Sequence, residues 1–294
     1  MLAQVSLTPA ESKKLIAKAV VKLDVVKRAS AEGLVVMHPS SSTFFIAEEL
    51  IGEKPKTSIW VCGLITSKGA CIGLGRAAIP EGRIRTSRPE EVNYSWVIQG
   101  GKLSTGITLG ELFEKMGSKD VYVKGVNALD FEGTVGVLIG SEVEGGTIGR
   151  VIGASKRKGF TIIFPVGLEK LIPIRIEEAA REALRTKYEY SMGLSCGLFP
   201  CKAGTVITEL MAIEILSGAK AIPIAAGGLG GAEGAVTLVI KGEKKQVIKA
   251  IEYVEQSKGA RLPPADTPVC GECGASNCRF PVNGKPWVLT GRST

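Results

Sequence analysis

The pattern of apolar and polar positions predicts short buried strands that alternate with amphipathic helices. Residues 9–32 carry apolar side chains at helical spacing, and residues 34–39 (LVVMHP) form a short apolar run typical of a buried strand. A polar loop, Pro39-Ser40-Ser41-Ser42-Thr43, separates this strand from an expected helix, FFIAEELIG. This order of strand, small polar loop and helix directs backbone N–H groups and hydroxyls at an anion.

The same alternation continues to about residue 187. We expect further strands at 58–65, 120–126 and 160–167, and helices at 108–117, 150–159 and 177–187. The glycine-rich stretch 69–105, with its alternating apolar positions, predicts short strands and turns. Strands that alternate with helices favour a mostly parallel sheet covered on both faces. We therefore expect an open Rossmann-like α/β domain over residues 1–185.

A second, smaller unit is expected over residues 186–262. The pattern there predicts helices at 209–218 and 244–257 and strands at 205–208, 219–228 and 235–242. A helix-strand-strand-helix order suggests a ferredoxin-like α+β domain. Beyond Leu262-Pro263-Pro264 the sequence is irregular, and residues 263–294 form a cysteine-rich C-terminal tail.

Composition narrows the classes of partner. The chain has 294 residues, a net charge of +8 and 5% aromatic residues. The aromatic residues are too sparse for a platform that stacks single-stranded bases, and the basic residues are dispersed, so nucleic acid is not the expected partner. Anionic small molecules suit the charge. The absence of a long apolar run and of a secretory leader, with seven cysteines, predicts a cytoplasmic protein that does not enter the membrane.

The sharpest chemical signal is the segment Cys270-Gly-Glu-Cys273-Gly-Ala-Ser-Asn-Cys278. Thiolates at C-x2-C spacing grip a metal ion from both sides of a tight turn, and glycine knuckles allow the backbone to fold around it. A closed tetrahedral site needs a fourth ligand, for which Cys196, Cys201, a partner chain or an open position are the alternatives. Zinc is the first choice, and a [4Fe-4S] cluster is the rival. The alternative to a metal site is that the three cysteines are free thiols in a flexible tail.

Two segments resemble a known superfamily. LVVMHPSSSTFFIAEEL is similar to the first strand-loop-helix of the superfamily that contains ribose-5-phosphate isomerase, glucosamine-6-phosphate deaminase and the CoA transferases. The stretch that begins DVYVKGVNALDFEGTVG resembles its second signature, in which a strand ends in Gly-Ala-Asp-Glu before a glycine-rich turn. The likeness covers roughly residues 15–175. It implies the same α/β fold and a ligand that is a phosphorylated sugar or a CoA ester.

The resemblance also assigns roles to positions. The Ser-Thr pair of the superfamily loop falls on Ser42 and Thr43, which implies binding of phosphate or CoA by hydroxyls and backbone. The two loop glycines become Pro39 and Ser41. The isomerase carboxylates and lysine fall on Asn127, Ala128 and Glu144, and only the later aspartate, Asp130, is kept. An amide cannot act as a general base, so these positions depart from the arrangement that the isomerase uses.

Several candidate residues follow the strands expected to end at 38 and 126. In open α/β sheets, ligands bind outside the carboxyl ends of the strands. We therefore expect one crevice, with an anion bound by the serine loop and Lys124, the substrate oriented by Asn127, and acid/base chemistry from Asp130 and the single histidine, His38. The residues of this crevice are His38, Ser40, Ser41, Ser42, Thr43, Lys124, Asn127 and Asp130.

Other features have alternative readings. Glu233, in the glycine-rich segment GGLGGAEGAV, resembles the nucleophilic glutamate of a CoA transferase, but the favoured interpretation is a carboxylate in a turn. Arg83, Arg85 and Arg88 could bind an anion or lie on a solvated edge, whereas Cys62 and Cys71 are expected to be structural. The second unit also resembles bacterial microcompartment shell proteins and ACT-like regulatory domains, which implies oligomerisation or effector binding.

Two hypotheses follow. In the first, the protein is a cytoplasmic isomerase- or transferase-type enzyme that binds an anionic metabolite and carries a cysteine-ligated metal. In the second, it is a non-catalytic metabolite sensor or assembly protein with a structural zinc. In both, we expect a homo-oligomer.

Overall fold

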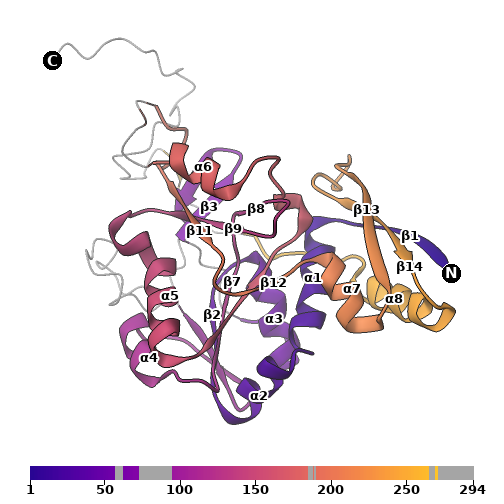
Figure 1. Ribbon diagram of the computed structural model, residues 1–294, viewed down its shortest axis with the longest axis horizontal. Coiled ribbons are helices and arrows are strands. Elements are labelled where there is room, and N and C mark those ends of the chain that lie inside the picture. The colour runs from indigo at the N-terminus through magenta and orange to yellow at the C-terminus, as the bar shows by residue number, and fades with distance from the viewer. Residues whose placement is uncertain (57–61, 73–94, 185–187, 189, 265–268, 271–294) are drawn as a thin grey trace.

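A six-stranded mixed sheet forms the centre of the molecule (Figure 1). The computed structural model describes residues 1–56, 62–72, 95–184, 188, 190–264 and 269–270. In spatial order, the central strands are β12 (Thr205–Ile207), β10 (Thr161–Pro165), β7 (Val121–Lys124), β2 (Val35–His38), β5 (Trp96–Gln99) and β6 (Lys102–Ser104). The first four run parallel, β5 runs antiparallel to β2, and β6 runs antiparallel to β5. The expected α/β sheet, parallel in part, is therefore confirmed.

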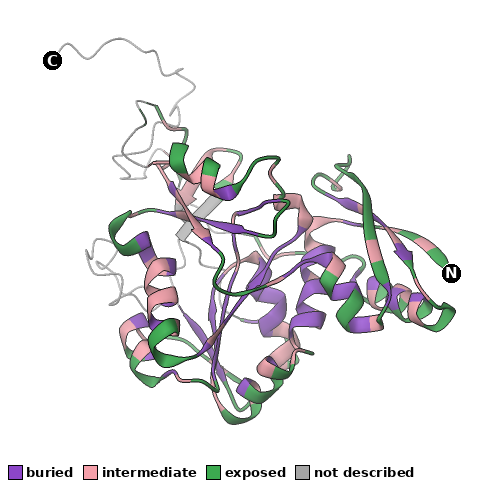
Figure 2. Ribbon diagram, viewed as in Figure 1, coloured by how far each residue is buried: buried purple, intermediate pink, exposed green. Residues whose placement is uncertain are grey.

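Helices cover both faces of this sheet. One face packs against α1 (Pro9–Val20), α2 (Asp24–Glu32), α3 (Ser41–Ile51) and α7 (Glu209–Ser217). The other face packs against α4 (Leu109–Lys115) and α5 (Gly146–Lys158). Each face has its own cluster of buried apolar side chains, and burial is densest along the central strands (Figure 2). We call these the α1 side and the α5 side of the sheet.

Helix starts follow local sequence chemistry. A capping box formed by Thr8 and Glu11 begins α1, with Pro9 at its first position. The apolar spacing over residues 9–32 suggested continuous helix, yet the structure breaks it between α1 and α2, where Leu23 takes an extended backbone conformation. The basic cluster at 156–158 occupies the exposed last turn of α5, where cations interact favourably with the helix dipole.

Two smaller sheets flank the parallel strands. One contains β8 (Ala128–Leu129), β9 (Val135–Ile139) and β11 (Gly197–Cys201), and lies on the α5 side. The other is a hairpin of β3 (Cys62–Thr66) and β4 (Gly69–Ile72). The expectation of a buried strand at 58–65 is therefore corrected, because β3 lies outside the central sheet and Ile65 is 60% exposed. The chain also forms two single turns of 3-10 helix, η2 (Val143–Gly145) and η3 (Leu168–Lys170), and helix α6 (Ile176–Glu182) comes after η3.

The third small sheet joins the two ends of the described chain. Its order is β1 (Leu2–Leu7), β14 (Val236–Lys241) and β13 (Lys220–Ala226), all antiparallel, with α7 and α8 (Lys244–Ser257) packed against it. The N-terminal strand thus pairs with residues of the expected second unit, while β11 and β12 extend sheets of the first. Sheets and core are built from residues on both sides of position 185.

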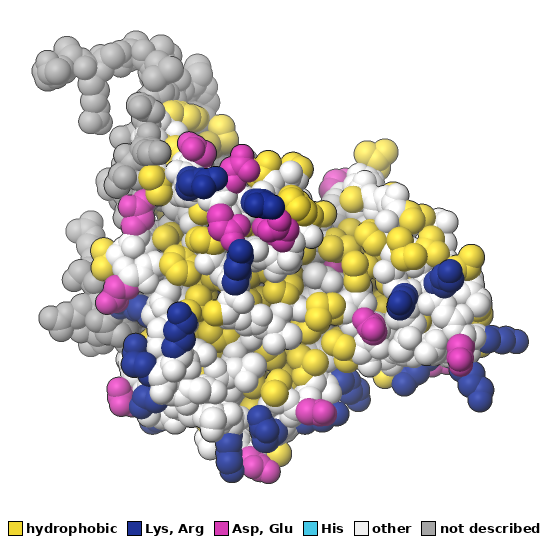
Figure 3. Space-filling view, viewed as in Figure 1, with side chains coloured by type: hydrophobic (Ala, Val, Ile, Leu, Met, Phe, Trp, Pro, Cys, Tyr) yellow, Lys and Arg dark blue, Asp and Glu magenta, His cyan; other side chains and the backbone are white. Residues whose placement is uncertain are grey.

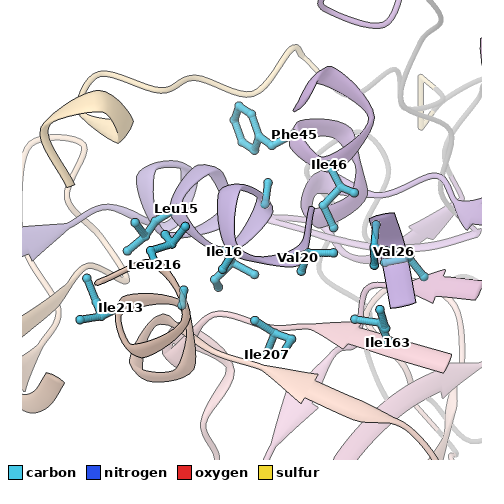
Figure 4. Close-up of a cluster of buried hydrophobic side chains, with 14 of the residues drawn as sticks. Leu15, Ile16, Val20, Val26, Phe45, Ile46, Ile163, Ile207, Ile213 and Leu216 are labelled. Atoms are coloured by element: carbon cyan, nitrogen blue, oxygen red, sulfur yellow. The ribbon is translucent and has the colours of Figure 1, made fainter. Parts of the chain in front are cut away.

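Helix α1 contributes to a core that the central sheet and the three-stranded sheet share. Its side chains Leu15 and Ile16 lie between α7, which contributes Ile213 and Leu216, and the central sheet, which contributes Ile163 and Ile207 (Figure 4). Phe45 and Ile46 of α3 complete the same cluster. One continuous core therefore connects the central sheet to the three-stranded sheet.

Candidate functional site

Strands β2 and β7 end side by side, as the sequence predicted. They pair in parallel, and His38 lies directly opposite Lys124 in the register. Both side chains are buried, with 3% and 7% of their surface exposed. A histidine and a lysine are thus held at the carboxyl edge of the sheet, the position at which α/β proteins bind ligands.

The alternation of side chains along each strand decides where these two groups point. Val36 and Tyr122 belong to the core cluster of the α5 side, whereas Met37 and Val123 belong to that of the α1 side. Because successive side chains point to opposite faces, His38 and Lys124 project to the α5 side. The ammonium group of Lys124 also acts electrostatically on Cys201 of β11, which lies on that side.

Burial shifts the pKa values of His38 and of the nearby Cys201. It lowers the pKa of His38 well below its ordinary value, and the positive charge of Lys124 lowers it further. The imidazole is therefore neutral at physiological pH, when it can accept a proton but holds none to give as an imidazolium. Burial also raises the pKa of Cys201 to about 12, against the opposing effect of Lys124, so this thiol is inert.

The serine loop sits on the other side of the same strand ends. A Cβ on Gly125 would lie 2.7 Å from Ser40 Oγ and 3.6 Å from Ser42 Cβ, so the loop packs directly over Gly125. Ser40 and Thr43 form a capping box for α3, and the Thr43 hydroxyl donates to the His38 carbonyl at 2.8 Å. These two hydroxyls hold the loop. The buried Ser42 Oγ has no hydrogen-bond partner among the described residues, and Ser41 is half-buried.

The side chains of Asn127 and Asp130 accept hydrogen bonds from backbone N–H groups of neighbouring segments. The Asn127 side-chain oxygen accepts from the Leu138 N–H of β9 at 2.9 Å. The buried Asp130 carboxylate accepts three backbone N–H groups, from Glu132, Thr134 and Ile176, at 2.9–3.0 Å. This geometry ties the β8–β9 turn to the start of α6. Of the residues expected to line one crevice, His38, Lys124 and the serine loop thus lie at the ends of β2 and β7, whereas the side chains of Asn127 and Asp130 bind the backbone of β9, of the β8–β9 turn and of α6.

Ser95 is a further buried polar residue at this end of the sheet, and no sequence pattern singled it out. It immediately precedes β5, its side chain is fully buried, and its Oγ has no hydrogen-bond partner among the described residues. The only signal in the sequence is a polar residue in front of an apolar run, which is common at strand starts. Its significance comes from the pairing of β5 with β2, a long-range contact.

A second buried polar cluster lies beyond the ends of β10 and β12. Lys13 Nζ contacts Glu169 Oε1 at 2.6 Å, and Lys170 Nζ donates to the Val126 carbonyl at 2.6 Å. Both oxygens of the fully buried Glu209 accept from the Leu168 N–H, at 3.1 and 3.0 Å. We call these four charged residues the η3 cluster.

Burial moves the pKa values of two groups in the η3 cluster, Glu209 and Lys170, toward physiological pH. Burial raises the pKa of Glu209 to about 7. Burial lowers the pKa of Lys170 to about 8, with help from the nearby Lys13 charge and against that of Glu169. The cluster thus contains an acid and a base that change charge near physiological pH. The sequence offered no pattern for it, because its members come from α1, η3 and α7.

The metal hypothesis falls mostly on residues outside the described part of the chain. Cys270 is half-buried with a free thiol, while Cys273 and Cys278 lie outside the described residues, as do Arg83, Arg85 and Arg88. Within the described residues, no group of three or more His, Cys, Asp or Glu side chains is placed to hold a metal ion. Cys196 and Cys201 are not in disulfide bonds, and their thiols donate to the Leu194 and Phe199 carbonyls.

Two further carboxylates have local partners. Glu233 Oε2 accepts from the Gly231 N–H at 3.0 Å, in keeping with a turn carboxylate. Glu144 forms an ion pair with Arg150 at 2.9 Å. Neither contacts the ends of β2 and β7 through these bonds.

Comparison with known proteins adds no family assignment. None of the helices in the described part of the chain has the length and apolar character needed to cross a bilayer. A scan against protein-family models and a search of curated proteins found no match to this chain.

Proposed function

We propose that the protein binds an anionic small metabolite, of the phosphorylated-sugar or CoA-ester class, at the carboxyl ends of β2 and β7. The observation that supports this most is the Lys124 ammonium, held beside neutral His38 at the end of parallel strands. A buried cation attracts an anion far more strongly than an exposed one, because water screens it less. We place the protein in the cytoplasm, in keeping with its cysteine content.

The chemistry that suits this site is proton transfer at a bound sugar phosphate or acyl group. A neutral imidazole can act as a general base in isomerase- or transferase-type reactions. Asp130 is the weaker candidate for this role, since its oxygens accept three backbone N–H groups. We therefore assign acid/base chemistry to His38 and a structural role to Asp130.

The test is ligand binding by calorimetry with ribose 5-phosphate, glucosamine 6-phosphate and acetyl-CoA as probes. We expect at least one probe to bind, and Lys124→Met to weaken that binding by about tenfold or more, as loss of a hydrogen bond from a charged group should. Lys27→Met, which removes an exposed lysine of α2, is the control and should bind normally. Failure of all three probes to bind the wild-type protein would reject the proposal.

One observation favours a second candidate function, a non-catalytic sensor that assembles from copies of itself. The edge strand β13 exposes Ile222 (49%) and Ile224 (53%), and Leu229 in the following loop is 89% exposed. Hydrophobic side chains gather over this part of the surface (Figure 3). A three-stranded sheet with an apolar edge strand of this kind suits contact with a second copy.

Light scattering coupled to gel filtration tests the assembly function. Wild-type protein should elute as an oligomer, and Ile224→Asp should shift it toward the monomer. Ile248→Asp, which alters a similarly exposed isoleucine on α8, should leave the mass unchanged. A monomeric wild-type protein would remove this candidate.

A metal at Cys270, Cys273 and Cys278 remains part of the proposal. Zinc would give a colourless protein with a structural tail, and a [4Fe-4S] cluster would give a brown protein with visible absorption. Metal analysis of anaerobically purified protein separates the two. The triple serine variant should lose the metal, whereas Cys71→Ser should keep it.

A further inference from the structure

The hydroxyl of Ser95 lies at the start of β5, level with the carboxyl end of β2, and has no hydrogen-bond partner among the described residues. The side chain of Ser95 is fully buried. Buried polar atoms in folded proteins nearly always have a partner, from the protein, from water or from a ligand. By contrast, the equally buried Ser257 hydroxyl donates to the Tyr253 carbonyl at 2.8 Å. The Ser95 hydroxyl is thus available to a bound molecule.

Strand register places Ser95 next to His38. Trp96 of β5 is opposite Met37 of β2 in an antiparallel pair, so one further step brings Ser95 opposite His38. Ser95 is two residues before Val97, so the two side chains point to the same face of the sheet, and Val97 belongs to the core cluster of the α5 side. Residues directly opposite each other in an antiparallel pair share a face. Ser95 therefore projects to the α5 side, as His38 and Lys124 do.

These three side chains form a transverse row across β5, β2 and β7. The row offers a hydroxyl, a neutral imidazole and an ammonium group on one side of the sheet. All three can donate a hydrogen bond, and one carries positive charge. Such a set suits an oxyanion, since phosphate and carboxylate oxygens accept several hydrogen bonds and carry the complementary charge.

We propose that Ser95, His38 and Lys124 together bind the anionic group of the ligand, on the α5 side of the sheet. This inference rests on the proposed function and adds the position of the anion. The serine loop lies on the opposite side of the strand ends, where Ser40 and Thr43 cap α3 and the buried Ser42 Oγ has no partner among the described residues. The row, unlike the loop, includes a charged donor, Lys124, so we assign the anion to the row and to the loop the role of holding the end of β2.

The single histidine of the chain makes the position of the anion measurable. With isotope-labelled histidine, one imidazole reports on the row by NMR. We expect the probe that binds in calorimetry to shift the His38 ring signals. Ser95→Ala should weaken binding by about tenfold, as loss of a hydrogen bond to a charged group does, without lowering the melting temperature. Ser42→Ala and Ser257→Ala should bind within about twofold of wild type.

Three outcomes would overturn the inference while leaving anion binding intact. The probe could bind without moving the His38 signals, or Ser42→Ala could weaken binding while Ser95→Ala does not. Ser95→Ala could also lower the melting temperature with unchanged affinity, which would show that the hydroxyl serves a buried structural water instead. Absence of binding by every probe is a different result, because it rejects the proposed function itself.

Discussion

At the scale of single residues, burial changes what a titratable group can do. His38 and Glu209 are both buried, and in each case the charged form is disfavoured, so the pKa of the histidine falls and that of the glutamate rises. The histidine is therefore neutral at physiological pH. The glutamate becomes a group whose charge changes in the physiological range, at the first turn of α7, where it contacts the backbone of η3.

Glu209 should make stability depend on pH. Its pKa rises from 4.5 to about 7 on folding, so its contribution is fully present below pH 4.5 and is lost as pH rises to about 7. Glu209→Gln removes this titration and keeps an oxygen for the Leu168 N–H. Relative to wild type, the variant should therefore gain unfolding free energy between pH 5 and pH 8, by about 3 kcal/mol at most.

Urea unfolding at the two pH values measures this effect. The exposed Glu214→Gln on the same helix is the matched control and should show no such gain. An equal difference between wild type and Glu209→Gln at pH 5 and pH 8 would show that Glu209 does not titrate in this range.

At the scale of elements, one side chain can join several pieces of backbone. The Asp130 carboxylate accepts N–H groups from the β8–β9 turn and from Ile176, the first residue of α6. A carboxylate at a helix start also interacts favourably with the helix dipole. The sequence suggested a catalytic aspartate here because a superfamily motif has one, but the motif carries no information on which groups the side chain meets.

Asp130→Ala should destabilise the protein by about 3 kcal/mol or more, because three backbone donors, those of Thr134 and Ile176 in buried hydrogen bonds, lose their acceptor. Glu132→Ala, which removes a partly exposed partner of Arg175 in the same turn, should cost less than about 1 kcal/mol. Chemical denaturation measures both. If Asp130→Ala were as stable as Glu132→Ala, the structural role would be wrong. Ligand affinity should survive in folded Asp130→Ala, since this residue is not assigned to the anion.

At the scale of the whole molecule, the two expected units share a core. β1 pairs with β14 along six residues, and α1 packs against both α7 and the central sheet. Leu7, the last residue of β1, is fully buried in this shared cluster. The shared cluster predicts that the central sheet and the three-stranded sheet unfold together.

Leu7→Ala should therefore lower the stability of the entire protein by about 2–5 kcal/mol, the usual cost of a large-to-small change in a core. Leu2→Ala, in the same strand but 66% exposed, should change stability by less than about 0.5 kcal/mol. Calorimetry should show one transition that shifts as a whole for Leu7→Ala. Two separate transitions, with only one of them shifted, would contradict a shared core.

The sequence by itself determined the local elements and the general class of fold. The apolar runs of β2, β7 and β10, and the caps of α1 and α3, are encoded within a few residues of each element, and the structure confirms the parallel pairing of β2 with β7. Periodicity is local information, so it identifies a strand but not its distant neighbours. For the same reason, it misplaced β3.

Only the tertiary structure decided which chemical groups meet. Ser95 comes to lie opposite His38 because β5 pairs with β2, and Glu209 contacts the backbone of η3 because α7 packs beside η3 and α1. The alternation of side chains, combined with the packing of α3 and α5 on opposite faces, separates His38 and Lys124 from the serine loop, which directly follows His38 in sequence. These relations depend on contacts between residues far apart in the chain, which no local pattern specifies.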